Sequence, residues 1–244
     1  MSQVRLLVAL AAAVAVLGPV GAAAADDFSP AEAEAARDGL QSALQGAVTA
    51  AAAKTDELDL PPSISESVRR VAFVQVDTVK EAKNIRAHGL GSLRAAGTIG
   101  VDPIAAGQTV NFTVPVELVG AYLTGDLVRK VNDVGPTGHF NTTIATYRLE
   151  AEGTATVSRG ACAFNFTAVK DIELGGVDTS VEGASLLNRV LAKEVSDGVR
   201  SGAVAIKDPI SRHVLQSLQE APQDCAASVR ERLAKVPAAA APAA

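Results

Sequence analysis

The chain has 244 residues, of which 48% are hydrophobic and 20% are charged. This composition is too apolar for a disordered protein, and the length suffices for one large domain or two small ones. The formal net charge is -5, and aromatic residues make up 3% of the chain with no Trp. Binding of nucleic acid requires a basic surface and usually aromatic stacking platforms, so this function is disfavoured. Composition therefore favours a carrier or scaffold over an enzyme.

Residues 1–25 are typical of a secretory signal peptide. Arg5 precedes an uncharged apolar stretch, and a run of small residues ends directly before Asp26. A membrane anchor is the alternative, but the apolar stretch is shorter than the roughly 20 residues that a span needs. We therefore expect a secreted, extracellular protein whose mature chain begins near residue 26.

Secretion gives meaning to the two cysteines and to three glycosylation sequons. Cys162 and Cys225 form an even pair, which predicts a disulfide in an oxidising compartment, with two buried thiols as the alternative. Asn-x-Thr sequons predict a glycoprotein with N-glycans on Asn111, Asn141 and Asn165.

A helix is predicted from residue 27 to about residue 53. Ser29, Pro30 and Glu32 provide an N-cap, a first-turn proline and a capping-box acid. Apolar residues then recur at helical spacing from Leu40 to Ala51. Because this stripe is narrow, we expect the helix to lie on the surface of the domain.

Strand patterning extends from residue 68 to residue 174. Apolar and polar residues alternate over residues 109–119, which gives this strand one apolar face and one polar face toward solvent. Related patterns occupy residues 71–79, 84–99, 145–157 and 162–174. Such runs exceed the usual strand length of about 5–6 residues. They predict a sheet of long antiparallel strands that is covered on one face only.

The C-terminal part of the chain is expected to provide that cover. Residues 184–206 carry apolar residues at helical spacing and predict a helix of roughly 35 Å, followed by a kink or a new helix start at Asp208-Pro209. Residues 236–244 read as a disordered Ala/Pro tail. The resulting prediction is one α+β domain over residues 26–235. In it, a long, curved antiparallel β-sheet wraps around a long C-terminal α-helix, with an N-terminal surface helix.

This order of elements resembles the group 7 mite allergen family over about residues 29–220. The stretch AKNIRAHGL at residues 82–90 carries most of the resemblance, supported by residues 122–127 and 183–191. That family is related to the juvenile-hormone-binding and takeout proteins, and to the tubular lipid-binding superfamily that includes bactericidal/permeability-increasing protein. The resemblance implies a secreted, non-enzymatic protein with an apolar groove or tunnel for a lipid, and it brings no catalytic residue or cofactor.

The expected ligand is small and hydrophobic, such as a lipid, a fatty acid or a terpenoid. Its predicted binding residues are apolar positions on the apolar faces of the strands and on the C-terminal helix. They are Phe112, Val114, Val116, Phe164, Phe166, Ile172, Leu174, Leu187, Leu191, Val195 and Val199. For every one of them, membership of an ordinary hydrophobic core is the alternative interpretation.

Neither a metal site nor a catalytic group is predicted. His88, His139 and His213 are far apart without ligand spacing, and no Gly-x-Ser-x-Gly motif of a hydrolase occurs. The favoured hypothesis is a secreted, non-enzymatic carrier of an apolar ligand. The alternative is a secreted recognition or immune protein that contacts microbial or membrane lipid at its surface without an enclosed cavity. Arg69 and Arg70 are candidates for contact with lipid headgroups.

Overall fold

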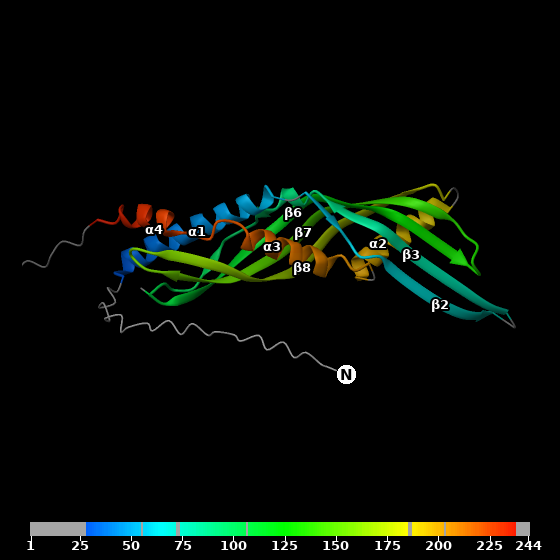
Figure 1. The fold of residues 1–244 in the computed structure, drawn as a ribbon, viewed down its shortest axis with the longest axis horizontal. Helices are drawn as coiled ribbons and strands as arrows, with labels where there is room; N and C mark the ends of the chain where they lie inside the picture. The colour runs from blue at the N-terminus through cyan, green and yellow to red at the C-terminus, as the bar shows by residue number, and fades with distance from the viewer. Residues whose placement is uncertain are drawn as a thin grey trace, which may run out of the picture.

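The computed structural model describes residues 28–54, 56–71, 74–105, 107–184, 187–202 and 204–237. The predicted signal peptide and residues 238–244 of the predicted tail lie outside the described residues. The described chain forms an eight-stranded antiparallel sheet with four helices along it (Figure 1).

The first helix, α1 (Pro30–Ala52), begins as the sequence predicts. The Ser29 hydroxyl accepts a hydrogen bond from the Glu32 backbone N–H, and the Glu32 carboxylate accepts one from the Ser29 backbone N–H. One face of α1 packs against the core, with Leu40 and Leu44 fully buried. The other face is exposed, for example at Ser42 and Gln45, so α1 lies on the surface of the domain as expected. Alanines and Gly39 on the buried face let neighbouring backbone approach closely.

One edge of the sheet is a long hairpin. β1 (Glu57–Asp59) and β2 (Ser63–Val71) both pair with β3 (Val74–His88), and they keep a single register along it. They are therefore one edge strand that Pro61 and Pro62 interrupt, since proline offers no N–H to a ladder.

Three long strands form the body of the sheet: β6 (Thr109–Val131), β7 (Thr137–Val157) and β8 (Cys162–Glu182). The 3-10 helix η1 (Leu90–Ser92) and the short strands β4 (Arg94–Ala95) and β5 (Gly100–Val101) connect β3 to β6, and β4 and β5 also pair with β6. The alternation predicted for residues 109–119 is confirmed, because its even-numbered residues are buried.

In the middle of β6, the buried positions switch from even-numbered to odd-numbered residues. Leu118 and Ala121 are both buried, and Gly120 between them has a φ of 69°. On β8, Gly176 has a φ of 63° directly before the buried Val177. Such backbone is accessible to glycine at low cost, and beyond Gly120 the alternation of β6 resumes with Ala121 and Leu123 buried.

The predicted long C-terminal helix is wrong. Three shorter helices occupy this region: α2 (Asn188–Ser201), α3 (Lys207–Gln219) and α4 (Ala226–Leu233). Gly202 adopts a left-handed conformation with a φ of 78° and ends α2. The sheet is open, running from β1 to β8 without closure, so it does not wrap around one helix.

The predicted disulfide between Cys162 and Cys225 is confirmed. It joins the first residue of β8 to the N-cap of α4, with the two Cα atoms 5.0 Å apart. The Cys225 backbone N–H also donates to the Cys162 carbonyl at 3.2 Å. The C-terminal helix is therefore tied to the start of the last strand.

Candidate functional site

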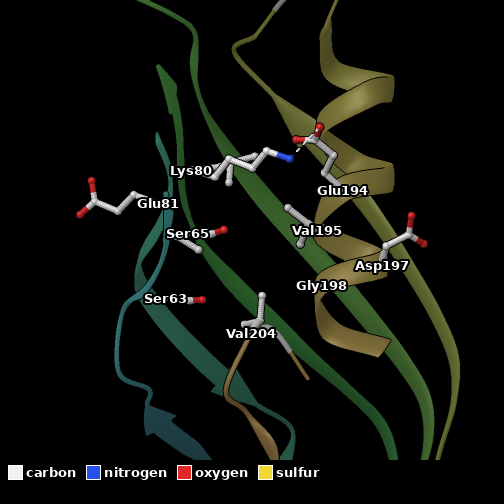
Figure 2. Close-up of a pocket in the computed structure, with 11 residues that line it drawn as sticks. Ser63, Ser65, Lys80, Glu81, Glu194, Val195, Asp197, Gly198 and Val204 are labelled. Carbon is white, nitrogen blue, oxygen red and sulfur yellow. Dashed lines mark ion pairs between the residues drawn. The ribbon is translucent and has the colours of Figure 1, made fainter. Parts of the chain in front are cut away.

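A groove of about 360 Å³ lies between α2 and the strands β2, β3 and β6. We call it the α2 groove, and Figure 2 shows its two walls, with the strands on one side and the helix on the other. Its lining residues are Ser63, Ser65, Lys80, Glu81, Ala82, Leu127, Glu194, Val195, Asp197, Gly198 and Val204.

Strand register explains why space remains here. Ser63, Ala82 and Leu127 lie side by side across β2, β3 and β6. Two of these three side chains are small, so the strand wall is thin at this level. On the opposite wall Gly198 has no side chain, and Val204 lies where its Cβ would point. The groove exists because small residues face one another across it.

The floor of the groove is apolar. Ala82, Leu127, Val195 and Val204 line it, and each is at most 8% exposed. Pockets that combine an apolar floor with a few polar groups are typical of small-molecule sites. The floor therefore suits a hydrocarbon group.

The rim of the groove is charged and is held by ion pairs. Glu194 of α2 lies 3.2 Å from the Lys80 Nζ and 3.4 Å from an Arg129 guanidinium nitrogen. These pairs connect α2 to β3 and β6. All three side chains are partly exposed, so each pair is worth at most about 1 kcal/mol. With Glu81 and Asp197 also present, the rim carries charges of both signs.

Of the predicted ligand residues, Val195 lines the α2 groove. Leu191 and Val199 are fully buried on the same helix, whereas Leu187 is 41% exposed at its N-cap. Leu191, Val195 and Val199 therefore share the inward face of α2.

The predicted residues on the long strands pack elsewhere. The rings of Phe112, Phe164 and Phe166 meet edge to face, with centroids 5.2 to 6.1 Å apart. Phe112 also lies over Gly153, its cross-strand partner on β7, where an added Cβ would meet the ring at 2.3 Å. These residues are close-packed and do not line the α2 groove.

The remaining predicted strand residues divide between the core and the surface. Val114 and Val116 are buried with the phenylalanines, and Leu174 is partly buried. Ile172 is 60% exposed, because bulges on β8 interrupt its alternation.

Sequence reasoning missed most of the α2 groove. Ser63, Ser65, Ala82, Leu127 and Gly198 were not assigned a role. The one local signal for the groove is the pair of serines at alternate positions of β2. It falls outside the predicted strand region, which begins at residue 68. The other contributions depend on cross-strand register, which is not local in sequence.

The three histidines lie in separate environments. His88 lies between the Glu57 carboxylate at 3.2 Å and the Thr124 hydroxyl at 3.0 Å, and it stacks on the Tyr122 ring. His139 pairs with Asp126. Among the described residues, no group of three potential ligands could hold a metal ion.

His213 on α3 is of a different kind. Its Nε2 atom is buried and has no hydrogen-bond partner within the part of the chain that the structure describes. Burial lowers the pKa of this imidazole, partly offset by the Glu220 carboxylate.

A partly buried hydrogen-bond network connects α3 to the sheet. The Tyr147 hydroxyl of β7 donates to the Asp171 carboxylate of β8, and the Ser211 hydroxyl of α3 donates to the same oxygen at 2.7 Å. Burial, followed by the bond to Asp171, raises the pKa of Tyr147 far above its usual value. The network is a structural connection and lies outside the α2 groove.

All three sequon asparagines lie on exposed strand positions. Asn111 and Asn165 both flank Thr154 in one row across β6, β7 and β8, and Asn141 lies near the start of β7. Their exposure is compatible with N-glycans, and glycosylation stays a prediction.

Comparison with known proteins yields little similarity. No protein-family model matches the chain, so the resemblance to group 7 mite allergens has no family match behind it. No curated protein matches its sequence. Among solved structures, the chain is similar to the crystal structure of a lipopolysaccharide binding protein at 9% identity with a TM-score of 0.40. The match covers 80% of this chain and 39% of that one, and its low score carries no argument about function. No helix in the described ranges is long and apolar enough to cross a bilayer.

Proposed function

We propose that the protein is a secreted, non-enzymatic carrier that binds one small hydrophobic ligand, such as a lipid, in the α2 groove. The observation that carries this proposal is the groove itself, with about 360 Å³ of space above an apolar floor. That volume lies within the range of small-molecule sites, about 300–1,000 Å³.

The energetics suffice for a single alkyl chain. Burial of a methylene contributes about 0.8 kcal/mol, so ten of them contribute about 8 kcal/mol before the costs of association. A Kd of 1 μM corresponds to about 8 kcal/mol. We therefore expect micromolar or weaker binding, with the polar end of the ligand among the charged groups of the rim.

Two features support secretion. The first 25 residues have the pattern of a signal peptide, and the Cys162–Cys225 disulfide is typical of oxidising compartments. The chemistry of the groove supports a role other than catalysis. Lys80, the residue across from Ser65, is paired with Glu194 instead of standing as a free base beside the hydroxyl.

The proposal is tested by displacement of a fluorescent fatty acid from the delipidated protein. Ser65 lines the groove, so Ser65→Trp should fill part of it and weaken binding at least tenfold. The neighbouring Glu66 points to the other face of β2, so Glu66→Trp is the matched control and should bind as the wild type does. Failure of the wild type to bind the probe, or equal binding by both variants, would contradict the proposal.

A second candidate function is contact with membrane or microbial lipid at the surface. Val134 in the turn between β6 and β7 is 77% exposed, and Val131 beside it is 40% exposed. Co-sedimentation with anionic lipid vesicles that Val134→Lys abolishes, without binding of monomeric fatty acid, would favour this function over the carrier.

A further inference from the structure

We propose that the α2 groove selects a ligand with an anionic headgroup, such as the carboxylate of a fatty acid, and that Lys80 and Arg129 bind this headgroup. The inference rests on the function proposed above, because it names the chemical class of the ligand for the same site.

Two cationic side chains lie directly opposite each other at the rim of the groove. Lys80 of β3 pairs in register with Arg129 of β6, so the two side chains share one face of the sheet. Like charges in such a cross-strand pair repel each other. The repulsion falls when an anion binds to both side chains, so this cation pair favours a bound carboxylate.

Glu194 supplies one carboxylate to the cation pair, and one positive charge remains in excess. Its carboxylate lies 3.2 Å from the Lys80 Nζ and 3.4 Å from an Arg129 guanidinium nitrogen. Among the described residues, neither cation forms another ion pair. An ammonium and a guanidinium together have more N–H donors than one carboxylate can accept. A second carboxylate can therefore bind without displacing Glu194.

The other two acids of the rim do not offset this excess. Glu81 alternates with Lys80 along β3 and so points to the other face of the sheet. Figure 2 shows the carboxylates of Glu81 and Asp197 pointing away from the space between the two walls. Asp197 also lies 3.9 Å from Arg200 of its own helix. Lys80, in contrast, extends from the strand wall toward Glu194 on the helix wall. A headgroup in the groove therefore faces the positive excess of the cation pair.

The cation pair lies next to the apolar floor. On β3, Ala82 is two residues from Lys80. On β6, its partner Leu127 is two residues from Arg129. Two residues along a strand span roughly 7 Å. A carboxylate held by the cation pair therefore places the first carbons of its alkyl chain over Ala82 and Leu127, and the rest of the chain extends along the groove.

A cationic or neutral headgroup fits this rim less well. A cationic headgroup would add a third positive charge beside the pair, and both cations already share Glu194. A neutral alcohol would leave the positive excess without a counterion, although it gains the same apolar contacts as an acid of equal chain length. Comparison of different headgroups on one alkyl chain therefore isolates the proposed interaction.

The test is isothermal titration calorimetry of the delipidated mature protein with decanoate, 1-decanol and decylammonium at about pH 8, where the acid is ionised. The wild type should bind decanoate most tightly and decylammonium most weakly. The quantity compared among variants is the acid preference, which is the Kd of 1-decanol divided by the Kd of decanoate. Because both values come from the same variant, a general effect of a substitution on folding or on the shape of the groove cancels.

Substitutions at the rim should change the acid preference in opposite directions. Lys80→Gln and Arg129→Gln should each lower it by about threefold to fivefold, the range expected for partly exposed charges. Glu194→Gln should raise it by a similar factor, because it removes the competing carboxylate. Lys130→Gln is the matched control and should leave the preference unchanged. It removes the same charge from the exposed neighbour of Arg129, which points to the other face of β6.

The results separate this inference from the proposed function. The inference is overturned if the wild type binds 1-decanol or decylammonium as tightly as decanoate, or if Lys80→Gln and Arg129→Gln both keep the wild-type preference. In those cases the groove still binds a hydrophobic ligand, and the proposed function stands. If none of the three compounds binds, the proposed function fails and the inference fails with it.

Discussion

Gly39 and Gly46 lie in the same helix in opposite surroundings. A Cβ added at Gly39 would lie 2.7 Å from the Val229 Cα and 2.9 Å from its backbone nitrogen on α4, whereas one added at Gly46 would meet nothing within 4 Å. Inside a helix, alanine is more favourable than glycine by about 1 kcal/mol. Gly46→Ala should therefore raise the free energy of unfolding by about 1 kcal/mol.

Gly39→Ala gains the same helix propensity but forces α1 and α4 apart. Overpacking of this kind costs about 1–3 kcal/mol, so the variant should be neutral or less stable than the wild type by up to about 2 kcal/mol. α4 cannot retreat freely, because the disulfide holds its N-cap. Urea denaturation of both variants provides the measurement. If Gly39→Ala stabilises as much as Gly46→Ala, the close approach of α1 and α4 is refuted.

Three further predictions concern the connections within the fold. Replacement of Cys162 and Cys225 by Ser opens a loop of 63 residues and should cost about 4 kcal/mol in urea denaturation, and a loss below about 1 kcal/mol would contradict the chain-entropy argument. Tyr147→Phe removes a hydrogen bond to a partly buried carboxylate and should cost about 1.5–3 kcal/mol by the same assay, while an unchanged midpoint would show that the network is not formed. Because burial lowers the pKa of His213 in the folded state, protons favour the unfolded state, and stability should fall as pH decreases below about 6.5. His213→Leu should remove part of that acid sensitivity between pH 7 and pH 5, and an identical pH profile would contradict this account.

The parts of the fold that the sequence predicts are those with a local signal. The alternation over residues 109–119 survives in β6 because each side chain there faces either core or solvent. Ser29 and Glu32 mark the start of α1, because a capping box needs only residues three apart. Prediction of the disulfide required only an oxidising compartment and an even number of cysteines.

The errors have physical causes. Residues 184–206 look like one helix because the apolar spacing continues past Gly202, which ends α2 through its left-handed backbone. Val204 and Ile206 then return to the core outside any helix.

The α2 groove could not be predicted from sequence, because it forms where small side chains from distant parts of the chain leave space between strands and helix. Ser63 and Ala82 meet only through the pairing of β2 with β3, and Gly198 faces them from a helix far along the chain. Lys80 and Glu194, which pair across the rim, read in sequence as ordinary surface charges. Most of the bulky apolar residues that the sequence predicts for the ligand wall lie in the core, and Val195 is the one that lines the α2 groove.

The central claim is that the α2 groove holds a hydrophobic ligand. Its most direct test is mass spectrometry of an organic extract of the purified mature protein, with delipidated protein offered a defined fatty acid as a second arm. The account predicts a co-purifying lipid or uptake of about one fatty acid per chain, with less than a tenth of that in Ser65→Trp. An extract without lipid, together with no uptake by the delipidated protein, would contradict it.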